Sequence, residues 1–543
     1  PDGDVNKVLQ QLLSAIDEYF KDEASLEKYT NGFLNSYTPS SGDVTRGDGN
    51  CDIIEVKQTS SYLYQPVWNS SLQGGWSNST WNFVYYINTF LERMHEAQGV
   101  SEAAFAHYEG TARFWRAWNY FELVKTFGGV PWYDHVVRSD SEEDLYKPRD
   151  SREYVMDKVL EDLTFASTYC LADAKYTKGS ALINKWVALA FKSRVCLYEG
   201  TFRKYHSREP SSDKPWQNDV NNADNKFLRE AAAAAKEIMD KGPFSLVTGD
   251  VKTAYRSLFT SAGLLTQEVI FGREYSKELS AFHETSWYYY SPTYGTKIAM
   301  TKKFMNTYLT TKGTPFTDID GYKTVDFIHE FDGRDARMAQ TVISPSYQMK
   351  ISGRTVPYSP NWKVTRTGYH PIKWSIDDDA DNVLSKAASW NSLPIIRYAE
   401  ILLNYVEALN EYDPGNPDIL TYLNMVRKRA GVPDIDKVYP EAVGNQTQMR
   451  ELIRRERHVE LCYENLRYFD IRTWMTAETE HGDVYGMNVD AKDHKPNGDF
   501  WKRTLCAHDS ARDGHRKFSP RGYLFPISQE EMDRTNCTQN YGW

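Results

Sequence analysis

Apolar residues recur every three or four positions along much of the chain, which is the pattern of amphipathic helices. The pattern is clearest over residues 101–127, and Gly128 and Gly129 then provide a stop signal. Residues 150–170, residues 180–206 and the alanine run at 231–235 repeat the pattern. We therefore predict a series of long helices in the first half of the chain.

Another helical pattern begins near residue 398. Tyr398, Leu402 and Tyr405 would share one face of a helix, and the run DPGNP at 413–417 predicts a tight turn after it. A second helix then reaches residue 430. Two helices joined in this way have roughly the size of a tetratricopeptide unit, so we predict a helix hairpin here.

Two stretches, about 243–393 and 475–527, have short apolar runs broken by Gly, Pro, Asn and Asp. Segments such as 268–272 predict isolated strands or extended linkers. We expect a single mainly α domain over residues 1–543, with its helical scaffold in 1–242 and 394–474. The two irregular stretches would form a loop-rich variable face with small β elements, and recognition residues usually lie on loops.

Bulk composition narrows the class of protein. The 543 residues carry a formal net charge of −10, which is opposite to the clustered Lys and Arg that bind nucleic acid. Mean hydropathy is −0.63, and no apolar run approaches the roughly 18 residues of a membrane-spanning helix. The chain starts at Pro1 without a basic and then apolar leader, so we expect that an export signal was removed or never present.

The six cysteines are far apart and form no CxxC motif, which argues against a zinc ribbon or a redox motif. We expect most of them to be buried small hydrophobic residues. The loop-like positions Cys506 and Cys537 would be able to pair in an oxidising compartment. The full set is Cys51, Cys170, Cys196, Cys462, Cys506 and Cys537.

The most unusual segment is RELIRRERHVELCYENLRYFDIRTW at residues 450–474. It predicts one helix in which Glu451 meets Arg455, and Arg457 meets Glu460, at spacings where side chains touch. Its apolar stripe would consist of Leu452, Val459 and Tyr463. We interpret the charges as buried pairs that fix how neighbouring helices pack, and not as catalytic groups.

Five blocks in this order resemble the SusD/RagB family, the outer-membrane nutrient-binding lipoproteins of Bacteroidetes. The blocks are ARFWRAWNYFELVKTFGGVP at 112–131, FDGRDAR at 331–337, IIRYAEILLN at 395–404, the 450–474 segment, and YLFPI at 523–527 with TQN at 538–540. The ending departs slightly from the family pattern, because Ser528 replaces a proline and Tyr541-Gly-Trp543 replaces Pro-Gly-Tyr.

This resemblance implies a tetratricopeptide-like helical scaffold whose variable face captures nutrient, usually a glycan, for polysaccharide utilization. It also implies a partner, a SusC-like TonB-dependent transporter, and a place at the cell surface on the outer membrane. Family members are held there by a lipidated N-terminal cysteine that this sequence lacks. They are not enzymes, and the resemblance implies no cofactor.

The chain has 15 Trp, 37 Tyr and 24 Phe, which is more than a core needs. Flat rings suit the apolar face of a sugar, although aromatic residues are more often core fillers. Trp76 follows two glycines in sequence without helical periodicity, so we predict that it is an exposed platform for a sugar. Asn69 and Asn78 are natural partners for hydroxyl groups, and Trp81 ranks lower because it has the position of a helix-start core residue.

A second aromatic cluster lies in the irregular region and consists of Trp287, Tyr288, Tyr289, Tyr290 and Tyr294. Four consecutive aromatic residues cannot all face one side of a helix or strand, so at least one or two must be exposed or line an irregular pocket. We predict that this cluster also contacts ligand. Stacking of two or three rings would give dissociation constants of roughly micromolar to millimolar.

Other candidate sites are weaker. The acidic run starting at residue 377 resembles a calcium loop, but it lacks glycine at the sixth position and glutamate at the twelfth. The irregular spacing of four histidines is not that of a metal site, so we expect them to lie on the surface. They are His481, His494, His508 and His515. No nucleophile motif occurs.

Three functions remain at this point. We favour a binding protein that captures an oligosaccharide, and we predict that Trp76→Ala weakens glycan binding at least tenfold with nearly unchanged thermal unfolding. A helix-rich carbohydrate-active enzyme would need two carboxylates, and no such pair is identifiable. A peptide-binding or protein-interaction scaffold is the third. New reducing ends in a bound glycan would identify the enzyme.

Overall fold

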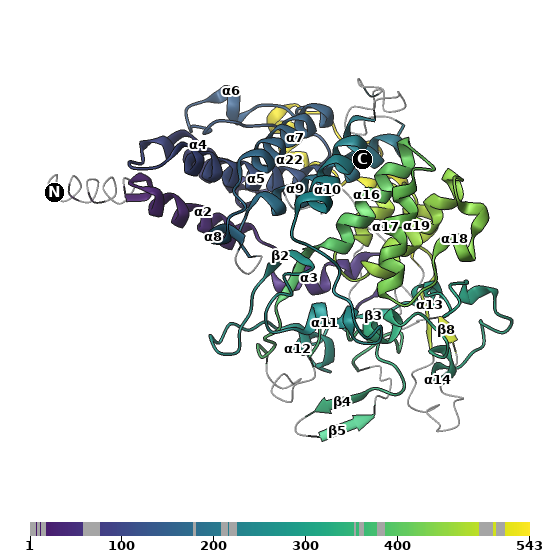
Figure 1. Ribbon diagram of the computed structural model, residues 1–543. Helices are drawn as coiled ribbons and strands as arrows, with labels where there is room; N and C mark the ends of the chain where they lie inside the picture. Colours follow the sequence, from purple (N-terminus) through teal and green to yellow (C-terminus); the bar gives the residue numbers. More distant parts are fainter. Residues whose placement is uncertain are drawn as a thin grey trace.

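Long helices make up most of the chain, as the apolar periodicity predicts. The computed structural model describes residues 7, 11, 18–57, 76–177, 181–207, 216, 225–351, 354–357, 363–376, 386–487, 503–505 and 516–543. Figure 1 shows the long helices in the upper half of the molecule, with short helices and small strands below them. The fold is therefore mainly α.

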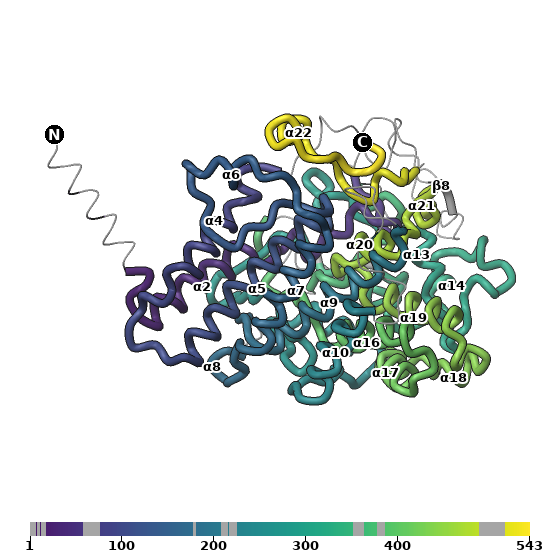
Figure 2. The backbone as a smooth tube through the Cα atoms, turned by 90° about the horizontal axis from the view of Figure 1, so that it is seen from above, coloured from purple at the N-terminus to yellow at the C-terminus, as the bar shows by residue number. Residues whose placement is uncertain are grey.

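The long helices pack in a continuous series, which Figure 2 shows from above. They are α2 (Glu23–Tyr37), α4 (Asn78–Arg93), α5 (Glu102–Phe127), α7 (Arg152–Tyr169), α9 (Lys185–Tyr205), α10 (Lys226–Lys241), α16 (Tyr398–Tyr412), α17 (Pro417–Arg429) and α19 (Gln446–Glu460). Helices α2 and α4 pack on α5, and contacts then run from α5 through α7, α9 and α10 to α16, which also contacts α17 and α19. The helix hairpin predicted near residue 413 is confirmed as α16 and α17.

Local sequence explains where these helices begin and how closely they approach. The Ser101 hydroxyl accepts a hydrogen bond from the backbone N–H of Ala104 at the start of α5, and Gly128 ends this helix with a φ of 80°. Gly110 lies so close to α7 that a Cβ atom would be 2.8 Å from the Sγ atom of Cys170. A larger residue at position 110 would push α5 and α7 apart.

The remaining helices are short. They are α3 (Ser41–Arg46), α6 (Glu142–Leu145), α8 (Ala174–Thr177), α11 (Ala254–Thr260), α12 (Thr285–Tyr290), α13 (Lys302–Thr307), α14 (Phe327–Glu330), α15 (Arg337–Thr341), α18 (Ile435–Val438), α20 (Arg467–Thr473), α21 (Ala477–Glu480) and α22 (Gln529–Thr535). Short 3-10 helices span Glu18–Phe20, Gly47–Asn50, Met94–Glu96, Phe316–Asp318, Pro440–Ala442 and Pro520–Tyr523.

The strands form four antiparallel pairs in the described part of the chain. The pairs are β1 (Ile54–Glu55) with β3 (Ala299–Met300), β2 (Val269–Arg273) with β6 (Leu393–Arg397), β4 (Gln348–Ile351) with β5 (Arg354–Pro357), and β7 (Tyr485–Met487) with β8 (Arg503–Leu505). Strand β2 confirms the extended segment predicted at 268–272.

Two hydrophobic cores meet at the β2–β6 pair. One core lies among the long helices and includes Phe271 and Ile396, and the other lies beneath it and includes Val269 and Leu393. Because neighbouring residues of the same two strands face different cores, the pair joins the helical scaffold to the irregular region.

The charged segment at 450–474 does not form the single predicted helix. It divides into α19 and α20, and between them Tyr463 and Asn465 have positive φ angles of 65° and 64°. Tertiary contacts hold this break, because the Trp374 indole donates a hydrogen bond to the carbonyl oxygen of Tyr463 at 2.9 Å. The backbone N–H of Asn465 donates to the carboxylate of Asp48.

The charges of this segment pair with other elements and not along α19. Glu451 is exposed and forms no ion pair with Arg455 in the described structure, and Arg457 pairs with Asp470 of α20 at 2.8 Å instead of with Glu460. The predicted ladder within one helix is therefore wrong. The prediction that buried pairs fix the packing of elements is confirmed.

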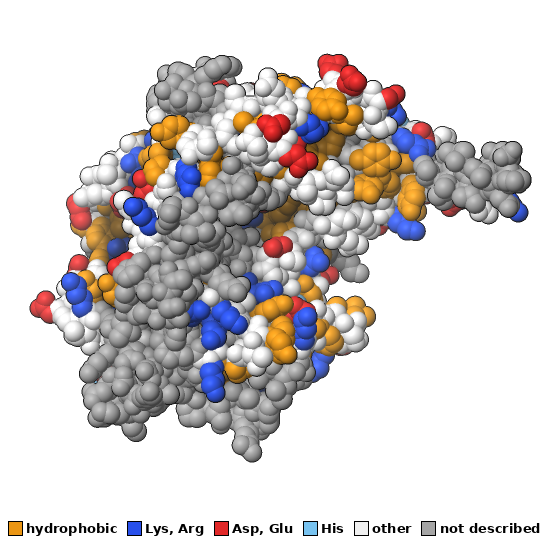
Figure 3. Space-filling model, turned by 180° about the vertical axis from the view of Figure 1, so that it is seen from behind, with side chains coloured by type: hydrophobic (Ala, Val, Ile, Leu, Met, Phe, Trp, Pro, Cys, Tyr) orange, Lys and Arg blue, Asp and Glu red, His pale blue; other side chains and the backbone are white. Residues whose placement is uncertain are grey.

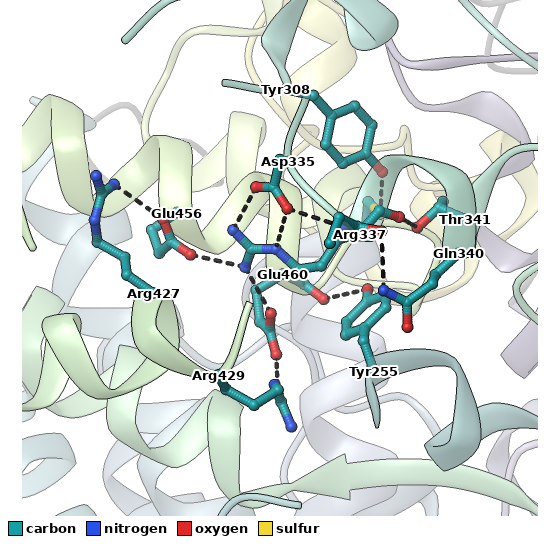
Figure 4. Close-up of polar contacts among 12 residues, drawn as sticks. Tyr255, Tyr308, Asp335, Arg337, Gln340, Thr341, Arg427, Arg429, Glu456 and Glu460 are labelled. Carbon is teal, nitrogen blue, oxygen red and sulfur yellow. Dashed lines mark hydrogen bonds and ion pairs between the residues drawn. The ribbon is translucent and has the colours of Figure 1, made fainter. Parts of the chain in front are cut away.

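We call the central group of these pairs the buried charge network, and Figure 4 shows the part of it around Arg337 and Glu460. It consists of Glu268, Asp335, Arg337, Arg397, Arg427, Arg429, Glu456, Glu460 and Glu464. Glu460 is its centre and accepts from Arg337 at 2.7 Å, from Arg397 at 2.9 Å and from Arg429. The network ties α15, α17, α19, β6 and the start of β2 together.

Burial raises the pKa of the Glu460 carboxyl, but the guanidiniums of Arg429, Arg397 and Arg337 outweigh it and hold the pKa well below the usual range. Glu460 is therefore ionised at neutral pH although no part of it is exposed. The ion pairs of its carboxylate are all to arginines of other elements, which is the arrangement of a structural charge.

The cysteines of the described part are buried free thiols, namely Cys51, Cys170, Cys196, Cys462 and Cys537. Cys506 lies outside the described residues, so its predicted pairing with Cys537 stays a prediction. Within the described ranges, the structure contains no helix long and apolar enough to span a membrane.

Candidate functional site

Helix α12 divides the aromatic cluster at 287–294 between the interior and the surface. Tyr289 is fully buried, and its hydroxyl donates to the carbonyl oxygen of Thr45 at 2.6 Å. Tyr290 is half-buried, stacks on His370 and shares a hydrogen bond with the hydroxyl of Ser375. These two tyrosines hold α12 on the second core, so we leave them out of the candidate site.

The other rings of this cluster face outward. Trp287 and Tyr294 stack with ring centroids 5.2 Å apart and an angle of 21° between their planes. Tyr294 is 66% exposed and Trp287 is half-buried. The four consecutive rings, of which the sequence predicts at least one or two to be exposed or in an irregular pocket, are half-buried or buried, and the exposed ring of the cluster is Tyr294.

Tyr288 lies beside this stacked pair and is held in place from two sides. Its ring centroid is 4.9 Å from that of Trp287, and the guanidinium carbon of Arg46 lies 3.7 Å from the centre of its ring. Its carbonyl oxygen accepts a hydrogen bond from the backbone N–H of Thr296 at 2.9 Å. Trp287, Tyr288 and Tyr294, together with Arg46, form what we call the α12 surface.

Trp76 lies in a different place, in a cleft of about 630 Å³ between α4, the 131–147 segment and α22. We call it the Trp76 cleft. Its aromatic lining consists of Trp76, Trp81, Tyr85 and Tyr133, and its polar lining includes Asn78, Asp144, Lys147, Glu530, Glu531 and Arg534. Concave sites with aromatic walls and a few polar groups are common ligand sites.

The Trp76 ring is less accessible than the sequence suggests. It is half-buried, with its centroid 5.2 Å from that of the buried Phe127 and 5.4 Å from that of Trp81. Trp81 packs on the core near the start of α4, as predicted, and Asn78 is exposed at the first position of this helix. Asn69 lies outside the described residues.

Several polar groups of the Trp76 cleft already have partners. Lys147 pairs with Asp150 at 2.9 Å, and Arg534 pairs with Glu531 at 2.6 Å. A ligand would have to compete with these ion pairs. On the α12 surface, Arg46 covers one face of Tyr288 and Lys386 lies 5.5 Å from the centre of the Trp287 ring, whereas Tyr294 is the exposed ring of the stacked pair.

The two aromatic clusters do not form one site. Figure 1 shows α4 and α22 in the upper part of the molecule and α12 near its lower end. They are therefore two candidate surfaces, which a single short oligosaccharide would not contact together.

Sequence reasoning missed a third aromatic surface, a groove of about 650 Å³ beside α2 and α4. Its exposed rings include Tyr19, Tyr85 and Tyr86, which are 46%, 55% and 49% exposed. Figure 3 shows hydrophobic side chains (orange) gathered beside the grey N-terminal residues. The sequence contains a signal for these exposed rings. The apolar stripe through Phe83 and Ile87 leaves positions 85 and 86 on the outer face of α4.

A cavity of about 470 Å³ lies between α5, α9 and the 464–473 segment. Among its lining residues is Glu407, whose pKa is raised to about 7 because it is buried. Arg457 and Asp470 also line it and are paired with each other at 2.8 Å. No sequence motif marked this cavity, because its lining comes from five separate parts of the chain.

One histidine differs from the sequence expectation. His481 is buried, its ring stacks on Phe518, and burial lowers its pKa to about 3. His494, His508 and His515, and most of the acidic run at 377–388, lie outside the described residues. Among the residues that are described, no three His, Cys, Asp or Glu side chains come together as a metal site would require.

Comparison with known families gives two matches that cover most of the chain. The model described as "SusD family" matches residues 267–543, and the model described as "Starch-binding associating with outer membrane" matches residues 6–197. The second match spans α2, α4, α5 and α7, and the first spans the α12 surface and the buried charge network.

Individual similar proteins are also SusD-like. SusD-like protein P2 of Formosa agariphila is 25% identical over 440 residues, which are 78% of this chain and 71% of that protein. A SusD-like protein from Bacteroides fragilis NCTC 9343 has a similar structure, with a TM-score of 0.73 and 24% identity over 97% of this chain and 98% of that chain.

A second structure from the same organism, described as a SusD-like carbohydrate binding protein, has a TM-score of 0.72 and 22% identity over 95% of this chain and 99% of that chain. The structural matches show the fold, and the family model that covers residues 267–543 includes half of the sequence. This chain belongs to the SusD family.

Proposed function

We propose that this protein captures an oligosaccharide at the outer surface of the cell and passes it, chemically unaltered, to a SusC-like TonB-dependent transporter. Membership of the SusD family supports this proposal, as does the family description that mentions starch binding and the outer membrane. The named relative that binds carbohydrate has the same fold. An N-terminal lipid anchor outside this sequence would hold the protein on the membrane.

The observation that carries the proposal is the outward-facing aromatic group of the α12 surface. Stacking on Trp287 and Tyr294 would bury the apolar face of a sugar, and each ring contributes about 0.5–1.5 kcal/mol beyond the burial of area. After the cost of ordering the ligand, we expect dissociation constants of roughly micromolar to millimolar. Such affinities allow release to a transporter.

The Trp76 cleft is the alternative location for the ligand. Its volume and its mixture of rings and polar groups suit a sugar. We rank it second because Trp76 itself packs against Phe127 and because several polar groups of the cleft already pair.

A glycan array on the purified protein identifies candidate ligands, and calorimetric titration of the strongest one locates the site. We expect Trp287→Ala to weaken binding at least tenfold and Tyr294→Ala to weaken it about three- to tenfold, since each removes one stacked ring. Tyr541→Ala is the matched control, because Tyr541 is 63% exposed at the opposite end of the chain. Unchanged affinity in both α12 variants would remove the ligand from this surface.

The same samples distinguish the other functions. Reducing ends that accumulate when the protein is incubated with its glycan would show an enzyme. Competition of the glycan by a peptide library would show a peptide-binding scaffold. We expect neither.

A further inference from the structure

Four cations lie on or close to the segments that carry the α12 surface. Arg46 lies on the Tyr288 ring, and the Tyr288 carbonyl oxygen accepts from the backbone N–H of Thr296. Lys297 follows Thr296, Lys57 follows β1, and Arg366 comes from the 363–376 segment. Backbone contacts fix this neighbourhood: the N–H of Lys57 donates to the Thr296 carbonyl at 2.8 Å, and the Arg366 Nη2 atom donates to the Lys57 carbonyl at 2.8 Å. We call these four residues the α12 cations.

No carboxylate of the described residues pairs with any of the α12 cations. Acidic groups on the adjoining elements have other partners. Asp43 of α3 accepts from Ser40, Glu55 of β1 pairs with Arg516 at 3.2 Å, and Glu284 before α12 lies 3.7 Å from Lys386. The α12 cations are therefore a concentration of positive charge in a chain whose formal net charge is −10.

Two of the guanidiniums also have unused donors. The Nε atoms of Arg46 and Arg366 are buried from solvent and have no hydrogen-bond partner in the described structure. A buried donor without a partner costs free energy. Arg46 and Arg366 are therefore held without their full set of acceptors in the described structure.

Repulsion among the α12 cations also indicates a site for an anion. Burial lowers the pKa of Lys297, and the nearby charges of Arg366 and Lys57 lower it further. Among the described residues, no acidic side chain raises the pKa of Lys297 in return, so a bound anion would relieve the repulsion. Figure 3 shows Lys and Arg side chains (blue) beside hydrophobic ones (orange) in the lower half of that face, at the level of α12 in Figure 1.

We propose that the α12 surface selects an anionic oligosaccharide, whose carboxylate or sulfate groups contact the α12 cations while its apolar sugar face lies on Trp287 and Tyr294. This inference rests on the proposed function and adds the chemical class of the ligand. The rings alone would accept neutral and acidic sugars equally, so the cations would provide the selectivity.

The first test is an array that presents matched pairs of glycans. Each pair would consist of an acidic glycan and its neutral form, such as oligogalacturonate with its methyl ester and a chondroitin sulfate oligosaccharide with its desulfated form. We expect the acidic member of the preferred pair to bind at least tenfold more tightly at 50 mM NaCl. The difference should shrink at 300 mM NaCl, because salt screens exposed charges. Tighter binding of the neutral members would overturn the inference.

The second test removes charge without removing the backbone contacts. The variant Lys57→Gln/Lys297→Gln keeps the carbonyl and amide groups that join β1 to Thr296 and Arg366. We expect it to bind the acidic glycan about tenfold more weakly and the neutral glycan within twofold of wild type. The control Lys241→Gln/Lys428→Gln makes the same charge change at exposed positions on α10 and α17, and should leave both affinities unchanged.

The two proposals fail in different ways. Binding of neutral glycans that Trp287→Ala abolishes, with no loss in Lys57→Gln/Lys297→Gln relative to the control, would reject the anionic ligand and leave glycan capture standing. Absence of binding to every glycan on the array would reject both.

Discussion

The buried charge network and the α12 surface both contain cationic side chains, but the surroundings of these side chains differ. In the network, Glu460 alone accepts hydrogen bonds from three arginines, and its members are nearly inaccessible to solvent. On the α12 surface, Arg46 lies on an aromatic ring, and Lys57 and Lys297 form no ion pair with a carboxylate of the described residues. Pairing and burial mark the charges that hold the fold, and unpaired cations beside exposed rings mark those available to a ligand.

This difference teaches how to interpret dense charge in a sequence. The segment at 450–474 is dense in arginines and carboxylates, yet its charges hold separate elements of the fold together. The α12 cations are spread over residues 46–366 and form no motif. Charge that is conspicuous in sequence is structural here, and charge that is dispersed in sequence gathers at the candidate site.

The largest effect should come from breaking the network. Glu460→Gln would replace the charged acceptor that three buried guanidiniums share with a neutral amide. Removing one partner of a buried ion pair typically costs about 3–5 kcal/mol. We expect a large drop in melting temperature, measured by calorimetry. Glu451→Gln is the matched control, since Glu451 is exposed on the same helix. Equal melting temperatures for the two variants would contradict a structural role for the network.

Acid should also weaken the network and lower the stability of the fold. The pKa values of Glu460 and Glu464 are lowered because nearby cationic side chains outweigh the effect of burial. A carboxyl whose pKa is lower in the folded state stabilises the fold above its unfolded pKa, about 4–4.5, and this contribution is lost as the pH falls through the folded pKa.

We therefore expect the melting temperature to fall steadily from pH 5 to pH 3, and to fall less steeply in Glu460→Gln. The α12 cations are Lys and Arg side chains and not carboxylates, so a change in melting temperature between pH 5 and pH 3 reports on the network. A melting temperature that is flat down to pH 3 would show that the buried pairs contribute no pH-dependent stability.

The smallest effect on ligand binding should come from Trp76→Ala. Because the ring packs on Phe127 and Trp81, we expect a loss of about 1–2 kcal/mol in the free energy of unfolding and glycan affinity within twofold of wild type. The sequence alone led us to expect the opposite. A tenfold loss of affinity with unchanged unfolding would restore that expectation and move the site to the Trp76 cleft.

The long helices were predictable because their determinants are local. Apolar spacing and caps such as Ser101 and Gly128 set α5 without reference to the rest of the chain. The break after Glu460 was not predictable, since Trp374 and Asp48 hold Tyr463 and Asn465 from distant parts of the sequence. The pairing of Glu460 with Arg337, Arg397 and Arg429 has the same origin.

The candidate site shows the same division. Four consecutive aromatic residues at 287–290 predict that some rings are exposed or line a pocket, but the tertiary contact of Tyr289 with Thr45 is needed to show that Tyr289 is buried. The α12 cations come from four separated segments, so no window of sequence contains them. Composition pointed to ligand-binding rings, and tertiary structure supplied the charge around them.

The most direct test of the account is a crystal structure of the protein with the glycan that binds most strongly on the array. We predict a sugar ring stacked on Trp287 or Tyr294, with an acidic group within hydrogen-bond distance, about 3 Å, of Lys57, Lys297 or Arg366. A sugar bound instead in the Trp76 cleft or in the groove beside Tyr85 and Tyr86 would contradict it.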